Sequence, residues 1–257
     1  MAPPLRVEVV GETNVGRKRT HNEDNFCILA EYGLYIVADG MGGHASGEVA
    51  SKMAIDTIKE FFERTADDPE RTWPYKLDRS KGYEENRLIT SIKLANLRIY
   101  EHAQRDSKTK GMGTTIVSIF TVENGVYCAH VGDSRVYRIR DGRLEQMTED
   151  HSLLNDYIKM KHLSAEEIAN FPHKNVIVRA LGMKETVKVD SRFDAPMAGD
   201  TYLLCSDGLC GPVSDDEILS IVVNTPDLPT ACRRLIERAN ENGGPDNITS
   251  VLARWVS

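Results

Sequence analysis

The chain has 257 residues, of which 40% are hydrophobic and 28% charged, and its formal net charge is −7. This composition is typical of a globular protein with enough apolar residues for a sizeable core. The acidic balance argues against nucleic acid as the main partner, because phosphate backbones are bound by basic surfaces. No apolar run reaches the length of a membrane span, and the N-terminus lacks the apolar segment of a signal peptide. We therefore expect a cytoplasmic protein.

In chain order, the sequence predicts many short strands with a few helices among them. Apolar or alternating runs predict strands over 5–12, 26–29, 34–38, 114–122, 126–131, 135–140, 143–147, 187–193, 201–205 and 248–253. Apolar residues at helical spacing predict helices over about 47–62, 88–99, 215–223 and 229–240. The dipeptides Asn124-Gly125 and Asp141-Gly142 predict tight hairpins. Helices set among consecutive hairpins favour an α+β fold, with antiparallel sheets packed between helix layers.

Acidic residues recur where predicted strands end. The apolar run 34–38 stops at Asp39, and a glycine-rich turn follows; taken alone, this is also the pattern of an ordinary strand–turn–helix link. Asp207 follows the strand 201–205, Asp246 lies in a turn before the last strand, and Asp133 lies at another strand junction. Oxygen ligands of this kind suit a hard cation, and several acids share a small site only when cations offset their repulsion.

At this point the sequence resembles the metal-dependent protein phosphatases of type 2C, in their bacterial branch. The motifs that carry the resemblance are, in order, Gly16-x-x-Arg19-x-x-Asn22-Glu23-Asp24, Val37-Ala38-Asp39-Gly40-Met41-Gly42-Gly43-His44, Gly113-Thr114-Thr115, Val131-Gly132-Asp133-Ser134-Arg135, Ser206-Asp207-Gly208 and Asp246-Asn247-Ile248-Thr249. Each motif is weak by itself, but together and in this order they cover nearly the whole chain.

The resemblance implies two stacked antiparallel sheets flanked by helix layers, a four-layer α-β-β-α sandwich, with a two-metal centre at one edge. It implies that Asp39 bridges both ions and that Asp207 and Asp246 complete the shell of one. The Gly40 carbonyl and the acidic pair Glu23-Asp24 would serve the other ion, directly or through water. We expect one domain over 1–257, because acids from both ends of the chain should converge.

Two further roles are implied for the same site. Arg19 would hold the substrate phosphate, for which a guanidinium is suited because it donates two parallel hydrogen bonds. Asp133, with Asp207, matches a weaker third-metal site. Oxygen ligands favour Mn²⁺ or Mg²⁺. Two such ions lower the pKa of a shared water, which would then attack the phosphate monoester without a phosphoenzyme.

The sequence departs from the best-known eukaryotic members at Met41, where those proteins have a histidine proposed to protonate the leaving oxygen. Methionine cannot do so, and His44 is expected to be structural, so the general acid stays open. The other six histidines are expected on the polar surface or as hydrogen-bonded core residues. The segment 151–182 corresponds to the variable flap beside the active site, where contacts to a protein substrate are expected.

These features predict a serine/threonine protein phosphatase that depends on Mn²⁺ or Mg²⁺. Its partners would be phosphorylated proteins, the targets of a serine/threonine kinase, without nucleic acid or a membrane span; the oligomeric state stays open. One alternative is a pseudophosphatase that keeps the fold as a binding module, against which the complete set of acids counts. The other is a structural cation-binding protein, against which Arg19 counts, because it is suited to an anion beside the cations.

Overall fold

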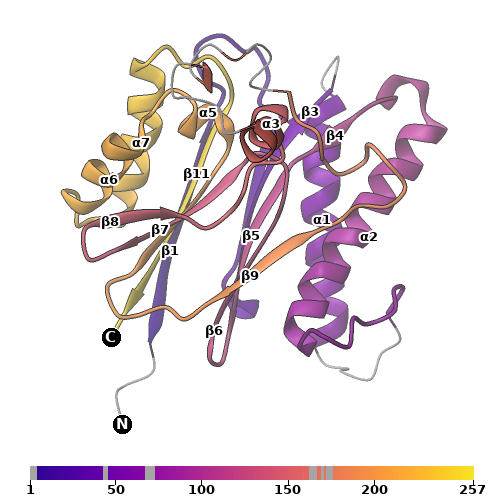
Figure 1. The fold of residues 1–257 in the computed structure, drawn as a ribbon, viewed down its shortest axis with the longest axis horizontal. Helices are drawn as coiled ribbons and strands as arrows, with labels where there is room; N and C mark the ends of the chain where they lie inside the picture. Colours follow the sequence, from indigo (N-terminus) through magenta and orange to yellow (C-terminus); the bar gives the residue numbers. More distant parts are fainter. Residues whose placement is uncertain (1–4, 43–45, 67–72, 162–166, 169–170, 172–175) are drawn as a thin grey trace.

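Two antiparallel β-sheets stack face to face between two layers of helices, as the sequence predicts (Figure 1). The computed structural model describes residues 5–42, 46–66, 73–161, 167–168, 171 and 176–257. The first sheet has the order β1 (Arg6–Asn14), β11 (Ile248–Val256), β10 (Thr201–Cys205), β7 (Arg135–Arg140) and β8 (Arg143–Gln146). The second has the order β2 (Asp24–Leu29), β3 (Leu34–Met41), β5 (Ile116–Val122), β6 (Gly125–Val131) and β9 (Asp190–Asp194), and β4 (Gly113–Thr114) pairs with β3.

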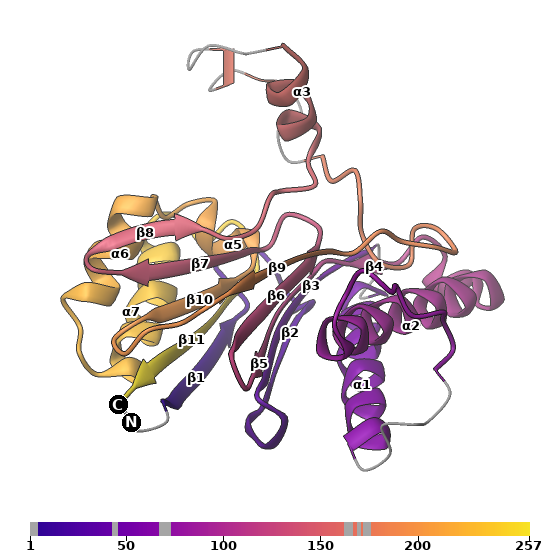
Figure 2. The same ribbon diagram turned by 60° about the horizontal axis from the view of Figure 1, so that its bottom comes forward.

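The helices cover the outer face of each sheet. The second sheet is covered by α1 (Ser46–Ala66) and α2 (Tyr83–Arg105), and the first by α5 (Asp207–Cys210), α6 (Asp215–Val223) and α7 (Leu228–Glu241). A further helix, α3 (Leu153–Lys161), stands away from the sandwich on the segment between β8 and β9 (Figure 2). Single 3₁₀ turns occur at Ala30–Tyr32 and Ser107–Thr109. Among the described residues, no helix combines the length and apolar character needed to cross a bilayer.

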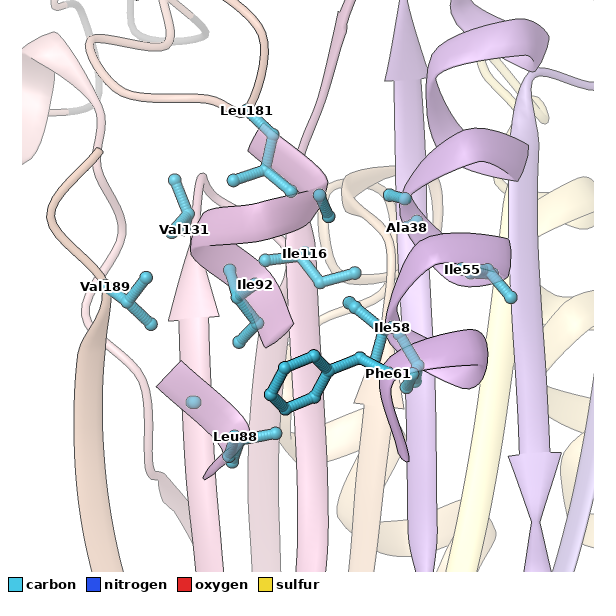
Figure 3. Packing of buried hydrophobic residues seen from close by; sticks show 14 of the residues in the cluster. Ala38, Ile55, Ile58, Phe61, Leu88, Ile92, Ile116, Val131, Leu181 and Val189 are labelled. Carbon is cyan, nitrogen blue, oxygen red and sulfur yellow. The ribbon is translucent and has the colours of Figure 1, made fainter. Parts of the chain in front are cut away.

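Three groups of buried apolar side chains hold these layers together. Under α1 and α2, residues such as Ile58, Ile92 and Ile116 interlock, and Leu181 joins them from the end of the flap segment (Figure 3). A second group packs α5, α6 and α7 on the first sheet, and a third fills the space between the sheets. The burial of this apolar surface stabilises the sandwich and makes a rigid frame for the ends of its strands.

Several local features differ from the prediction, including the single strand expected over 114–122, which is divided into β4 and β5. β3 continues through Asp39 and Gly40 to Met41, because β4 supplies a new antiparallel partner beyond the end of β5. The short helix α5 begins directly at Asp207, where the sequence indicated only a turn. β9 begins at Asp190, three residues later than the predicted strand. The pattern Ser164-x-x-Glu167, which is typical of a capping box that opens a short helix, lies partly outside the described residues.

Candidate metal centre

The main chain of Asp39 is held from several sides. Its amide donates to the Thr115 hydroxyl (3.1 Å), while its carbonyl oxygen accepts from the Thr114 hydroxyl and the Thr115 amide (both 2.8 Å). The Thr115 hydroxyl is in turn hydrogen-bonded to that of Ser134 (2.7 Å). These bonds explain the Gly113-Thr114-Thr115 motif: it forms β4 and fixes the direction in which the Asp39 side chain leaves the sheet.

Asp24 lies directly opposite Asp39 in the β2–β3 ladder. Its carboxylate is buried, and one oxygen, Oδ2, accepts from the hydroxyls of Ser206 (2.8 Å) and Thr249 (2.7 Å). The other oxygen, Oδ1, is buried without a hydrogen-bond partner. Burial raises the pKa of this carboxyl group. A buried acceptor with no partner is costly, and a cation or its bound water would satisfy it.

Asp207 brings a second strand end to the same place. It begins α5 just after β10, and its carboxyl group lies close enough to Asp39 for its negative charge to raise the pKa of that residue. Burial raises the pKa of both groups, and the negative charges of neighbouring aspartates raise it further. Like charges this close cannot both ionise unless positive charge offsets their repulsion. The arrangement therefore fits the divalent cations that the resemblance implies.

Asp246, about a third of whose side chain is exposed, lies beside Arg19. The guanidinium Nη2 donates to Asp246 Oδ2 at 2.6 Å, and about half of the Arg19 side chain is exposed. Two glycines allow the chain to pass close to this turn. A β-carbon on Gly16 would collide with the carbonyl oxygen of Asp246, and one on Gly208 with that of Asn247. The turn is thus packed against both the 16–19 segment and α5.

Glu23 and Gly40 are neighbours on the other side of Asp39. The Gly40 amide donates to the Glu23 carbonyl oxygen (3.2 Å), and the Glu23 carboxylate accepts from the Gly47 amide (3.2 Å) in the first turn of α1. A helix N-terminus attracts such an anion. The structure therefore places Glu23 beside the site, with one carboxylate oxygen engaged by the helix. Met41 pairs with Gly113 in the β3–β4 bridge, and His44 lies outside the described residues.

Asp133 lies just after β6 and is buried at 8% exposure. Its Oδ1 has no hydrogen-bond partner, and burial, followed by the charges of Asp207 and Asp150, raises its pKa to about 7. With Asp207 and Asp246 it lines a cavity of about 480 Å³ that also borders the start of the flap segment. Among the described residues of the site, Oδ1 of Asp24 and Oδ1 of Asp133 are thus buried acceptors that lack a hydrogen-bond partner from the protein.

Several residues that hold the acids were missed as functional by sequence reasoning. They are polar neighbours of the acids rather than acids themselves, namely Thr114, Thr115, Ser134, Ser206, Asn247 and Thr249. Most of them lie within three positions of an acid in the same motif, and that spacing was the available signal. Their hydroxyl and amide groups bond across segments that are far apart in sequence, so their partners could not be inferred.

The fold and this cluster of acids make a candidate metal centre at one edge of a double-sheet sandwich, and comparison with known proteins identifies the family. The chain matches the family model described as protein phosphatase 2C over residues 13–256, and it belongs to that family. The serine/threonine phosphatase Stp of Listeria welshimeri is 37% identical over 248 residues, covering 93% of this chain and 92% of that protein.

Solved structures agree. The crystal structure of the Mycobacterium tuberculosis serine/threonine phosphatase PstP/Ppp has a TM-score of 0.85 at 35% identity, covering 99% of this chain and 100% of that one. The catalytic domain of PstP in complex with two manganese ions has a TM-score of 0.80 at 34% identity, covering 99% and 100%. The chain is thus a phosphoprotein phosphatase with the α+β sandwich of its family, and both the resemblance and the predicted class of enzyme are confirmed.

Proposed function

We propose that the chain hydrolyses phosphoserine and phosphothreonine monoesters with a water activated at a two-metal centre. The main support for this proposal is the convergence of the half-buried Asp39 and Asp207 with the buried Asp24, which lies opposite Asp39 in the β2–β3 ladder and has one oxygen without a hydrogen-bond partner. Bound cations would offset the repulsion among these acids and keep them ionised near neutral pH. The two manganese ions in the PstP complex support the same chemistry here.

The resemblance implies which acids hold each ion, and their convergence at one edge of the sandwich supports that assignment. Asp39, at the centre, would bridge both ions; Asp207 and Asp246 would complete one shell. The Gly40 carbonyl, Glu23 and Asp24 would serve the other, partly through water. Asp133, with Asp207, would hold a third, weaker ion. Mn²⁺ and Mg²⁺ both suit these oxygen donors.

The chain's own residues would position the reaction. When bound, the ions supply an acidified water and offset the charge of the phosphate. Arg19 would draw the phosphate toward them: its guanidinium already reaches Asp246, and half of it is open to solvent. The threonine and serine hydroxyls around Asp39 and Asp24 would hold these ligands in fixed directions, so that little reorganisation accompanies the reaction.

The substrates we propose are phosphorylated proteins, the targets of a serine/threonine kinase. The flap at about 151–182, within one domain over 1–257, would contact them, because it borders the same cavity as Asp133, Asp207 and Asp246. A pseudophosphatase that binds phosphoproteins without turnover is the alternative.

Turnover of a phosphothreonine peptide, with and without added Mn²⁺ and with a chelator as control, tests the proposal. We expect phosphate release that requires Mn²⁺ and stops with the chelator. Release that is unaffected by the chelator would contradict the metal-dependent mechanism. Binding of the phosphopeptide without any release would instead establish the pseudophosphatase.

A further inference from the structure

His151 is the first residue of the flap segment, and it makes two hydrogen bonds to Gly132, the residue before Asp133 of the candidate site. It is buried, at 6% exposure. Its amide donates to the carbonyl oxygen of Gly132 (2.9 Å), and its imidazole Nδ1 accepts from the Gly132 amide (3.0 Å). Gly132 directly precedes Asp133. Both main-chain polar groups of Gly132 are therefore hydrogen-bonded to His151.

Gly132 has no side chain and can be held only through its main-chain amide and carbonyl groups. Its φ of +118° lies in the region that favours glycine, and a β-carbon there would lie 2.6 Å from Cβ of Thr115. The position must stay glycine, and a glycine offers only its main chain for contacts. The two bonds from His151 thus fix the peptide that sets the direction of the Asp133 side chain.

The same bonds determine where the imidazole carries its proton. A backbone N–H is always a donor, so Nδ1 must present its lone pair to Gly132. In the neutral ring the proton is therefore on Nε2, which donates to Asp190 Oδ2 (2.9 Å) on β9. Arg179 Nη1 donates to the same oxygen (2.7 Å) and also lies 2.8 Å from Nε2; because a guanidinium only donates, it makes no hydrogen bond with the protonated Nε2. Burial, followed by the neighbouring His130, lowers the pKa of His151 to about 4, in keeping with an uncharged ring.

This arrangement also excludes a metal at the cluster. His130, His151 and Asp190 are the one group of three among the described residues whose ligand atoms all lie within 4.8 Å of one another. A metal on His151 would need a free lone pair, but Nδ1 is used by Gly132 and Nε2 carries the proton. Arg179, already on Asp190, adds a positive charge at the same point. The cluster serves to orient the imidazole.

His151 further connects the two ends of the flap. Its carbonyl oxygen accepts from the Val178 amide (2.9 Å), and one residue pair along, the Leu153 amide donates to the Val176 carbonyl oxygen (2.9 Å). The entering and leaving segments are thus paired at His151. From there Gly132 leads to Asp133, so any displacement at the base of the flap would be transmitted to that carboxylate.

We infer that His151 is a positioning residue for Asp133: as a neutral, Nε2-protonated imidazole it locks Gly132 and ties the flap base to the acid. This inference rests on the proposed role of Asp133 as an ion ligand. The orientation of Asp133 therefore depends on the hydrogen-bond acceptor at Nδ1 of His151, and not on the bulk or the charge of the His151 side chain.

The protonation state is tested directly by ¹⁵N NMR of the histidine side chains in the full chain. We expect His151 to show an unprotonated Nδ1 and a protonated Nε2, unchanged between about pH 5.5 and 8. Rapid exchange between the two tautomers, or a titration near the ordinary histidine pKa of about 6.5, would overturn the inference. This readout does not depend on catalysis.

Three variants then separate positioning from simple packing. His151→Asn places an amide oxygen near the position of Nδ1 and keeps the acceptor for Gly132. His151→Gln places its amide near Nε2, toward Asp190, and His151→Leu keeps neither. We expect the Gln and Leu variants to lower kcat for the phosphopeptide and to raise the Mn²⁺ concentration for half-maximal rate, each roughly tenfold, because a buried N–H loses its acceptor. The Asn variant should stay within about threefold of wild type.

The matched control is His130→Gln, which removes the ring stacked on His151 but keeps a donor toward the Glu149 carbonyl oxygen. It should not change the Mn²⁺ requirement. Equal rescue by Gln and Asn, or normal kinetics in all three His151 variants with only a lower melting temperature, would overturn the inference. If the Leu variant does not fold, the Asn–Gln comparison decides. If the wild type shows no turnover, the proposed function fails, while calorimetric Mn²⁺ titration of the Asn and Gln variants and the NMR measurement still decide the role of His151.

Discussion

The side-chain Oδ1 of Asn247 accepts a hydrogen bond from the Glu23 amide (2.8 Å), although 224 positions separate the two residues. Its amide group donates to the carbonyl oxygens of Val15 and His21 (both 2.9 Å). One buried side chain thus closes the loop between β1 and β2 onto the turn that carries Asp246. Glu23, Asp24 and Asp246 are brought to one place through this junction.

Asn247→Ala should lower the free energy of unfolding by about 2–4 kcal/mol, because it leaves one donor and two acceptors of the main chain without partners. It should also weaken Mn²⁺ binding, since acids from both segments lose their register. Chemical denaturation and calorimetric titration measure the two effects. Asn242→Ala, which removes an exposed amide from the Pro212 carbonyl oxygen, is the control and should cost less than about 1 kcal/mol. Equal effects of the two substitutions would contradict the role given to Asn247.

Arg19→Ala should lower kcat/KM for the phosphopeptide roughly ten- to a hundredfold, because a charged hydrogen bond to the phosphate is lost. Mn²⁺ affinity should not fall, since the variant removes a cation from beside Asp246. Steady-state kinetics and calorimetry check the two expectations. The control is Arg17→Ala, an exposed arginine on the same segment. An unchanged kcat/KM in the Arg19 variant would show that another group binds the phosphate.

Asp133→Ala should retain the fold and the two tight ions but slow turnover of a protein substrate roughly 10- to 100-fold. One carboxylate beyond the shared Asp207 makes a poor shell, so the ion there should be mostly hydrated and weak. Calorimetric Mn²⁺ titration should then lose only its weakest binding event. A large drop in melting temperature together with loss of the tight sites would instead make Asp133 a structural turn residue.

Much of the sandwich could be predicted from the sequence because its patterns are local. The strand 201–205 and the helix 215–223 agree with β10 and α6 at both ends, and Asp141 and Gly142 adopt the positive φ values of a tight hairpin. The end of β3 could not be predicted, because Gly40 and Met41 read as a turn until β4 is placed beside them. Strand length there depends on a partner more than 70 positions away.

The candidate site, like the fold, could be predicted from the sequence only in part. The acids were recognisable because each follows or precedes an apolar run or a glycine turn, and the family motifs select them from the other acids. Their supports were not recognisable: Ser206 and Thr249 meet Asp24 only in the folded chain. His151 was expected either on the polar surface or as a hydrogen-bonded core residue, and the structure shows it buried and bonded. Its link to Gly132 depends on the path of the flap, which no local pattern encodes.

Folding stability should fall as the pH is lowered through the range in which His151 would take up a proton. Burial first, then His130, lowers its pKa from 6.5 to about 4, against the nearby carboxylate of Asp190; Arg179 also faces the ring. Between these values the unfolded chain binds more protons than the folded one, so stability decreases with decreasing pH. At about pH 5 this difference in proton binding should lower the free energy of unfolding by on the order of 1–2 kcal/mol.

Denaturation at several pH values measures this dependence. His151→Asn should show a shallower fall in stability between about pH 6.5 and 4 than wild type, because the titrating group is gone. His21→Asn, which removes an exposed histidine, is the control. If the wild type and the His151 variant lose stability in parallel, the ring is not held neutral by the fold.

The substitution Asp39→Asn tests most directly whether Asp39 bridges two catalytic ions, as proposed. The variant should fold, because an uncharged amide removes the repulsion among Asp24, Asp39 and Asp207. We predict that its turnover of the phosphothreonine peptide at saturating Mn²⁺ falls on the order of 100- to 1,000-fold or more, since one ligand serves both ions. Asp56→Asn, the same change at an exposed position of α1, should leave the rate unchanged. A folded Asp39→Asn enzyme with a rate near that of the wild type would contradict the two-metal account.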